Sequence, residues 1–211
     1  MRVLVAGATG VVGRRVVEQA LARGHAVVAV ARSADRLTID DPNLEKVPAD
    51  ILDPHKINPL LKNVDAVVSV VGIGTSRTPT ALYSEGTKNL VCAMGAHGVE
   101  RIVALSAEPA EHWAHRGLLK QLVVFPLLQT FFGASYDDMR RMDIVLWESH
   151  VRWTTIRAPR IRDVHAKGHY RISADGPLKA GWAVTATDLA SALLDLIEKD
   201  RFIRSPTFIA N

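Results

Sequence analysis

The sequence contains a single cysteine, Cys92, so no intramolecular disulfide can form within its 211 residues. A lone cysteine is typical of a protein that works in a reducing compartment. Met1 leads directly into "RVLVAGATG" without a polar-then-apolar leader, so we expect neither a signal peptide nor a lipidation signal. These features predict a cytoplasmic protein.

Long apolar runs and blocks of one charge are also missing. The most apolar segment, residues 117–134, carries Lys120, Gln121, Pro126 and Gln129 and is too short to span a bilayer comfortably. The net charge is +4, and the arginines are spread along the chain instead of forming a basic block with interleaved aromatic residues. We therefore expect no membrane span and no nucleic-acid partner, and we expect small anionic ligands such as phosphate groups.

Metal ligands are sparse. His112 and His115 have the spacing of two ligands on one helical face, but no further ligands accompany them. The interpretation as surface histidines is favoured, and no metal site is predicted.

Apolar strand-like runs alternate with amphipathic helical segments along most of the chain. Parallel strands joined by helices require right-handed crossovers, which cover both faces of the sheet. We therefore predict an α/β, Rossmann-like, doubly wound parallel sheet in one domain over residues 1–211. The end of the chain differs, because a turn at Asp175-Gly176-Pro177 separates two alternating segments and predicts a small hairpin. The expected strands are 2–6, 26–31, 44–50, 65–72, 101–106, 152–159 and 206–210, and the expected helices follow Gly10 and cover 54–63, 82–98, 136–150 and 187–199.

The stretch "GATGVVG" places Gly7, Gly10 and Gly13 between the first strand and the first helix. Glycines here let the backbone approach a pyrophosphate, while the helix N-terminus supplies N–H donors and a favourable dipole. We predict a dinucleotide site formed by these glycines with Thr9, Val11 and Val12, in which the Thr9 hydroxyl adds a donor. The alternative is a tight structural turn without a ligand.

The residues that follow the second expected strand indicate whether the site prefers NAD or NADP(H). An NAD site would carry an acidic residue there, beside the ribose. This chain has Arg32-Ser33 there, with Arg36 close behind. A guanidinium can hold the 2′-phosphate of NADP(H) with two hydrogen bonds, so Arg32, Ser33 and Arg36 predict NADP(H), with Arg14 as a helper. The alternative for Arg36 is a solvated loop arginine.

Further cofactor contacts follow from the rule that ligands of open parallel sheets lie beyond the carboxyl ends of the strands. Asp50 and Ile51 are expected to flank the adenine, and Val71 and Gly72 to face the ribose and pyrophosphate. Ser106 and Pro159, at the ends of the fifth and sixth strands, are expected beside the nicotinamide.

These residues resemble a family, the atypical short-chain reductases of the biliverdin-IXβ reductase or flavin reductase type, and more loosely the NmrA-like NADP-binding proteins. The resemblance implies a Rossmann-like domain, NADPH as hydride donor, and flat conjugated acceptors such as flavins, quinones or linear tetrapyrroles. It is carried by "GATGVVG", "SEGTKNLVCAMGAHGVERIVALS" (84–106), "VLWESHVRWTTIRAPRI" (145–161), and "ADGP" followed by "VTATDLASALL". A polycyclic aromatic ketone is a further candidate acceptor.

The chain departs from that family at several positions. Ala107 follows Ser106 where the family has a Thr-Ser pair, and Arg160 and Met139 stand where biliverdin-type members have histidines. The segment 107–135 also looks about ten residues longer, a length more often tied to function than to filler. We expect this apolar insertion to form a substrate wall or a subunit interface, which leaves the protein a monomer or a homodimer.

Hydride transfer is the cofactor's own chemistry, and a flavin or quinone can take its proton from water. A carbonyl acceptor needs a proton donor, for which Ser106 and Tyr136 are the candidates, with Arg160 or Arg140 stabilising a developing oxyanion. Ser135 and Asp138 also resemble a capping box, so Tyr136 is expected at a helix start. Two other functions stay open: an NADP-binding sensor without catalysis, and a natural-product tailoring enzyme.

Overall fold

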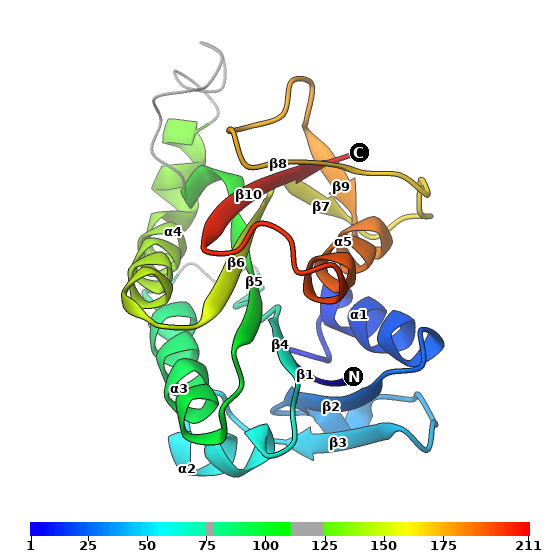
Figure 1. Ribbon diagram of the computed structural model, residues 1–211. Coiled ribbons are helices and arrows are strands. Elements are labelled where there is room, and N and C mark those ends of the chain that lie inside the picture. The colour runs from blue at the N-terminus through cyan, green and yellow to red at the C-terminus, as the bar shows by residue number, and fades with distance from the viewer. Residues whose placement is uncertain (75–77, 111–124) are drawn as a thin grey trace.

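The computed structural model describes residues 1–74, 78–110 and 125–211 (Figure 1). Within them, eight strands form one sheet in the order β3-β2-β1-β4-β5-β6-β10-β8, and two short strands, β7 and β9, pair separately. The strands are β1 Arg2–Ala6, β2 Ala26–Ala31, β3 Leu44–Pro48, β4 Ala66–Ser69, β5 Arg101–Ala107, β6 Arg152–Ala158, β7 Arg160–Arg162, β8 Arg171–Ser173, β9 Ala183–Thr185 and β10 Ser205–Ala210. The helices are α1 Val11–Ala22, α2 Pro54–Ile57, α3 Leu82–His97, α4 Phe125–Glu148 and α5 Ala186–Glu198, with 3-10 turns at Ala34–Arg36, Asn58–Leu61 and Glu108–Ala110.

All neighbours from β3 to β10 are parallel, and only β8 runs antiparallel, at the edge beside β10. The strand order reverses direction between β1 and β4, which is the crevice where doubly wound sheets bind ligands. The doubly wound Rossmann-like class predicted from the sequence is confirmed.

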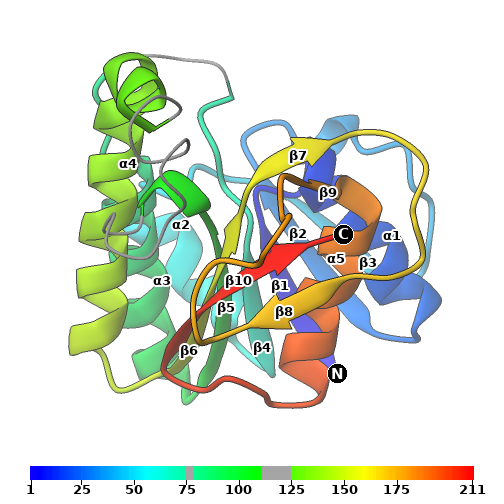
Figure 2. The same ribbon diagram turned by 90° about the horizontal axis from the view of Figure 1, so that it is seen from above.

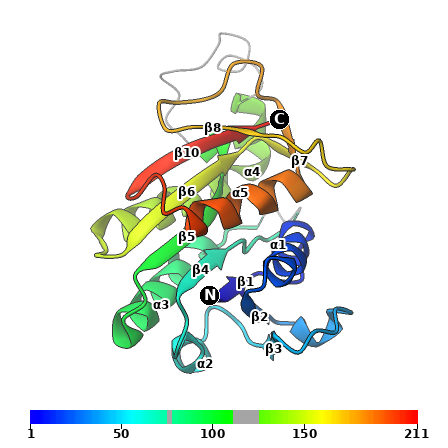
Figure 3. The same ribbon diagram turned by 45° about the vertical axis from the view of Figure 1, so that its right-hand side comes forward.

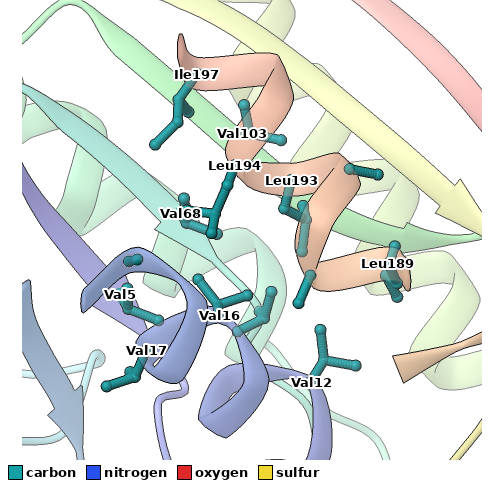
Figure 4. Close-up of a cluster of buried hydrophobic side chains, with 14 of the residues drawn as sticks. Val5, Val12, Val16, Val17, Val68, Val103, Leu189, Leu193, Leu194 and Ile197 are labelled. Carbon is teal, nitrogen blue, oxygen red and sulfur yellow. The ribbon is translucent and has the colours of Figure 1, made fainter. Parts of the chain in front are cut away.

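Helices α1 and α5 lie side by side on one face of the sheet (Figures 1 and 3). Their apolar stripes pack against the sheet through β-branched and leucine side chains, including Val16, Leu193, Val68 and Val103 (Figure 4). Because these side chains are removed from water on both sides of the interface, they supply much of the hydrophobic stabilisation of this layer.

Helices α2, α3 and α4 cover the opposite face. Their core contains Leu90 and Met94 of α3 with Met142 and Leu146 of α4, packed on the reverse side of the same strands. Gly98, in the left-handed conformation with φ +70°, ends α3 as expected of a C-terminal glycine. In the described part of the chain, no helix combines the length and apolarity needed to cross a membrane.

The prediction that a helix starts at Tyr136 is wrong, because α4 already includes Phe125–Glu148. Ser135 and Asp138, which look like a capping box, are buried within the helix. Gly133 lies inside the same helix, where glycine costs about 1 kcal/mol relative to alanine. The Asp138 carboxylate accepts a hydrogen bond from the Tyr83 N–H of α3, so the residue that would complete the capping box serves a different helix.

The predicted C-terminal hairpin is also wrong. The strand before the turn, β8, pairs antiparallel with β10, and the strand after it, β9, pairs parallel with β7. Figure 2 shows β7 and β9 together, beside α5. Gly176 in the turn has φ +129°, so the turn signal is genuine. The open edge of β10, which the local sequence does not reveal, provides the partner for β8.

Two smaller differences concern the third strand and the helix that follows it. The strand stops at Pro48, and the segment expected as one helix over 54–63 divides into α2 and a 3-10 turn that begins at Asn58. Pro59 lacks a backbone N–H, so it cannot donate the hydrogen bond that would continue α2 through this point.

Candidate functional site

A cleft of about 1110 Å³ runs along the carboxyl edge of the parallel strands. It is lined by residues at or just beyond the ends of β1, β2, β3, β4, β5 and β6, together with residues of α1, α3 and α4. The residues predicted for the cofactor that line it are Gly7, Thr9, Gly10, Val11, Val12, Arg32, Ser33, Asp50, Ile51, Val71, Gly72, Ser106 and Pro159. Gly13 and Arg36 are not among the lining residues.

The three glycines of the first turn have different structural roles. Gly7 has φ +86°, and a Cβ there would stand 2.7 Å from the Val70 carbonyl oxygen, so only glycine fits between β1 and the exit of β4. A Cβ on Gly13 would stand 2.1 Å from the Gly7 carbonyl oxygen, so this glycine lets α1 pack on the turn. A Cβ on Gly10 would meet nothing closer than 3.4 Å. Gly10 is therefore the glycine whose open side faces the cleft.

The N-terminus of α1 points into this end of the cleft without a cap. Gly10 at the N-cap offers no side chain, and no acidic residue occupies the first turn. In contrast, Asp53 caps α2 and Thr185 caps α5. The free N–H groups and the positive end of the helix dipole fit a phosphate anion, and the site therefore fits the pyrophosphate of a dinucleotide.

Arg32 lies at the end of β2 on the rim of the same cleft, and its side chain is exposed. In the described ranges it forms no salt bridge, whereas Arg15 pairs with Glu18 and Asp163. A guanidinium that no carboxylate neutralises is available to an anionic ligand. Arg36 is exposed as well, one turn further from the cleft.

The loop after β3 closes the same end of the cleft in a fixed conformation. The Asp50 carboxylate accepts a hydrogen bond of 3.0 Å from the Leu52 N–H, and Asn89 of α3 donates one of 3.0 Å to the Ile51 carbonyl. A Cβ on Gly86 would stand 3.0 Å from the Ile51 side chain, so α3 presses directly on this loop. Ile51 and Asp50 thus form a preorganised wall where the adenine is expected.

The opposite end of the cleft is largely apolar and contains the hydroxyl group of Ser106. Ser106 is 3% exposed, and its Oγ has no hydrogen-bond partner among the described residues. Leu82, Met139 and Ile161 line the cleft with it. A buried hydroxyl without a partner is costly in a folded protein, and a ligand that hydrogen-bonds to it removes that cost.

The pair Tyr136 and Arg140 lies away from this lining. Tyr136 is 9% exposed, and its ring centroid lies 6.4 Å from that of Phe132. The pKa of its phenol is raised, mainly by burial and to a smaller extent by the neighbouring Tyr83. Arg140 donates to the Ala110 carbonyl at 3.0 Å and pairs with Asp137. Arg160 is exposed on β7 and is not among the lining residues either.

Tyr83 is a site residue that the sequence reasoning missed. It lines the cleft from the first turn of α3, although it is only 5% exposed. Its position just after the exit loop of β4 was a usable signal, because that loop always borders the crevice in this fold class.

Metal binding finds no support in the parts of the chain that the structure describes, where no group of three or more His, Cys, Asp or Glu side chains is arranged to hold an ion. His112 and His115 lie outside the described residues, as do residues 111–124 of the predicted apolar insertion. Residues 125–135 of that insertion belong to α4.

Known proteins share both the sequence pattern and the fold. An uncharacterized chloroplastic protein of Arabidopsis thaliana is 30% identical over 188 residues, covering 85% of this chain and 66% of that protein. The 3-diazoavenalumate denitrifying reductase of Streptomyces sp. is 39% identical over 117 residues, covering 50% of this chain and 38% of that protein. The chain thus spans less than two thirds of the length of either relative.

Among solved structures, a short-chain dehydrogenase/reductase of Veillonella parvula in complex with NADP superposes with a TM-score of 0.82 at 15% identity, over 100% of this chain and 94% of that one. At that identity the likeness shows a common fold. A family model described as NAD(P)H-binding matches residues 7–200, nearly the whole chain. The chain therefore belongs to the NAD(P)H-binding family, as its motifs predicted.

Proposed function

We propose that this protein is an NADPH-dependent reductase that delivers hydride to a flat conjugated acceptor. One observation carries the proposal: a single continuous cleft joins an uncapped helix N-terminus at Gly10 to an apolar end that contains Ser106. The first end suits the phosphates of a dinucleotide, and the second suits an apolar ring system beside the nicotinamide.

The preference for NADPH rests on Arg32. Its exposed guanidinium lies on the cleft rim where an NAD site would carry a carboxylate, and it can hold a 2′-phosphate with two charge-assisted hydrogen bonds. The complex of the Veillonella parvula relative with NADP is consistent with this choice.

The acceptor class follows from the apolar end of the cleft. Leu82, Met139 and Ile161 offer apolar, uncharged contact surfaces. Such walls favour a flavin, a quinone, a tetrapyrrole or a polycyclic aromatic ketone over a small polar substrate. The Streptomyces relative is named a reductase, which supports reduction as the reaction type.

The protein's part in the reaction is to bind, orient and exclude water, because the bound cofactor itself supplies the hydride. The α1 N-terminus and Arg32 hold the phosphates, and Asp50 with Ile51 encloses the adenine. The Ser106 hydroxyl, which has no hydrogen-bond partner among the described residues, donates to the acceptor or to the nicotinamide end of the cofactor in this proposal. Two further residues keep a supporting part in the proposal, although neither lines the cleft: Arg160, exposed on β7 at the outer rim, and Tyr136, buried on the supporting helix α4.

Natural-product tailoring is the second candidate, favoured by the Streptomyces relative, a 3-diazoavenalumate denitrifying reductase. Both candidates are reductases and differ only in the acceptor. We place the protein in a reducing compartment such as the cytoplasm, where its exposed Cys92 stays a thiol. It works as a monomer or as a homodimer through the apolar segment 107–135.

The test is a consumption assay combined with a binding assay. Loss of NADPH absorbance is followed with FMN, quinones and aromatic ketones as acceptors, and NADPH affinity is measured by titration calorimetry. The proposal expects turnover with at least one flat acceptor. Tight NADPH binding without turnover on any panel would contradict the reductase and favour a redox sensor.

A further inference from the structure

Tyr83 of α3 contributes a phenol group to the cleft, although the sequence analysis assigned no site residue to this helix. It lies in the first turn of α3, and its ring packs in the core beneath the sheet, in the same cluster as Val71 and Met139. Among the described residues that line the cleft, it is the one tyrosine. Its ring is therefore held rigidly while one edge reaches the ligand space.

The hydroxyl of Tyr83 points towards the exit loop of β4. It accepts a hydrogen bond of 3.5 Å from the Ile73 N–H, and a Cβ on Gly72 would stand 3.9 Å from it. Gly72 and Ile73 both line the cleft. A phenol both accepts and donates, and in the described ranges no acceptor takes the Tyr83 proton. That proton is available to a ligand.

The backbone of Tyr83 is fixed from the neighbouring helix. Asp138 of α4 is fully buried, and its carboxylate accepts from the Tyr83 N–H at 2.8 Å and from the Ser84 hydroxyl. These charge-assisted hydrogen bonds pin the start of α3. The phenol therefore has the preorganised position that a catalytic proton donor requires.

The surroundings keep this phenol protonated. Burial is the main cause that raises the pKa of Tyr83, and the negative charge of Asp138 raises it further. The hydrogen bond from the Ile73 N–H lowers the pKa, but the net change is an increase. A phenol of this kind is neutral at physiological pH and acts as an acid or a hydrogen-bond donor, not as a base.

We propose that Tyr83 is the proton donor for a conjugated ketone bound in this cleft, an inference that rests on the proposed reductase function. As hydride forms the new C–H bond at the carbonyl carbon, the C=O π electrons move to oxygen, and that oxygen takes the phenolic proton. Water then returns a proton to the phenolate. The balance is one ketone, one NADPH and one proton giving one alcohol and one NADP⁺.

The first test compares two acceptors in the same variants. FMN can take its proton from water, whereas isatin, a flat bicyclic ketone, needs one delivered to oxygen. For Tyr83→Phe, we expect kcat/KM with isatin to fall by about 100-fold, the usual scale of general acid catalysis. The rate with FMN and the Kd for NADPH should change less than about threefold, because the ring and its packing remain. An equal loss with both acceptors would overturn the proposal.

Two matched variants identify the phenol. Tyr170→Phe removes a hydroxyl that donates to Asp195 on the far side of α5, and it should leave both rates unchanged. Tyr136→Phe removes the buried phenol on α4 that does not line the cleft. If Tyr136→Phe loses isatin reduction and Tyr83→Phe does not, the proton comes from Tyr136 and our assignment is wrong.

The second test detects contact between the Tyr83 phenol and a bound ligand without requiring turnover. A failure of this inference can therefore be distinguished from a failure of the proposed reductase function. Tyrosine labelled with ¹³C at Cζ gives resonances that the three Tyr→Phe variants assign, since the chain has three tyrosines. Adding NADP⁺ and isatin forms a complex that cannot react. A shift of the Tyr83 signal alone supports the proposal even if the wild type reduces nothing. An unmoved Tyr83 signal overturns it.

Discussion

The carboxylate of Asp138, in the second half of α4, accepts a hydrogen bond of 2.8 Å from the backbone N–H of Tyr83, in the first turn of α3. The same carboxylate accepts from the Ser84 hydroxyl. Ala81, at the N-cap of α3, provides no side-chain cap. Asp138 therefore caps α3 from a different helix, and one buried charge joins the two helices that border the apolar end of the cleft.

Replacing this cap should destabilise the protein more than replacing its neighbour. Asp138→Asn leaves buried donors with a weaker acceptor, and we expect a loss of about 1–3 kcal/mol in the free energy of unfolding. Asp137→Asn, on the half-exposed surface of the same turn, should cost less than about 0.5 kcal/mol. Urea denaturation of the two variants measures the difference, and equal losses would show that the cap contributes little.

Alanine substitutions at two glycines of the first turn should distinguish an effect on NADPH affinity from an effect on stability. Gly10 has φ −69°, which alanine adopts freely, and its Cβ would meet nothing closer than 3.4 Å. Gly10→Ala should therefore cost no more than about 1 kcal/mol of stability, the difference between glycine and alanine at an N-cap, while a methyl group in the phosphate space weakens NADPH binding about tenfold or more, or about 1.4 kcal/mol.

Gly13→Ala is the matched contrast, because its Cβ would overlap the Gly7 carbonyl oxygen at 2.1 Å. The backbone must shift, so we expect a loss of stability of about 1–3 kcal/mol. Thermal unfolding and calorimetric titration of both variants check the pair. A destabilised Gly10→Ala with unchanged NADPH affinity would contradict the assignment of this turn to phosphate.

The carboxyl group of Asp188 should make the free energy of unfolding decrease at acidic pH. Burial alone would raise the pKa of this carboxyl, but hydrogen bonds from the Lys167 N–H, the Thr185 hydroxyl, the Asn211 amide and the Gly168 N–H outweigh it and lower the pKa below the ordinary 3.8. A carboxyl whose pKa is lower in the folded state stabilises above its unfolded pKa and loses that contribution as the pH falls through the folded value.

The variant Asp188→Asn isolates this effect. At pH 7 it should be less stable than the wild type by about 1–3 kcal/mol, since it loses charge-assisted hydrogen bonds. The gap between the two should begin to narrow as the pH falls below about 4, where the carboxyl of the unfolded wild type takes up a proton, and should close once the pH passes the lower folded-state pKa. Urea midpoints measured from pH 7 down to acid provide the check, and a constant gap would refute the electrostatic origin.

The sequence predicted the sheet, and the gathering of distant residues around one cleft, because both depend on local signals. A β-branched run, a glycine turn and an amphipathic helix are visible within the first 22 residues, and the rule that ligands bind at strand ends then places Arg32, Asp50 and Ser106 around one cleft.

The errors arose where distant segments decide the structure. Ser135 and Asp138 look like a local helix start, but Asp138 caps α3 instead. The turn at Gly176 is real, yet its flanking strands pair with β10 and β7. Tyr83 was missed although it follows the β4 exit loop closely in the sequence, and the packing of α3 against α4 and that loop turns its phenol towards the cleft. A one-dimensional pattern does not contain these pairings.

The central claim, that this cleft binds NADPH with Arg32 on its 2′-phosphate, is tested most directly by titration calorimetry of NADPH and NADH with the wild type and Arg32→Ala. We expect the wild type to bind NADPH more tightly than NADH. Arg32→Ala should weaken NADPH binding by about tenfold to 100-fold, the worth of a charge-assisted hydrogen bond, and leave NADH within about twofold. Arg171→Ala, which replaces an exposed arginine of the edge strand β8 that does not line the cleft, is the control. Equal affinity of the wild type for both cofactors, or equal losses for both in Arg32→Ala, would contradict the account.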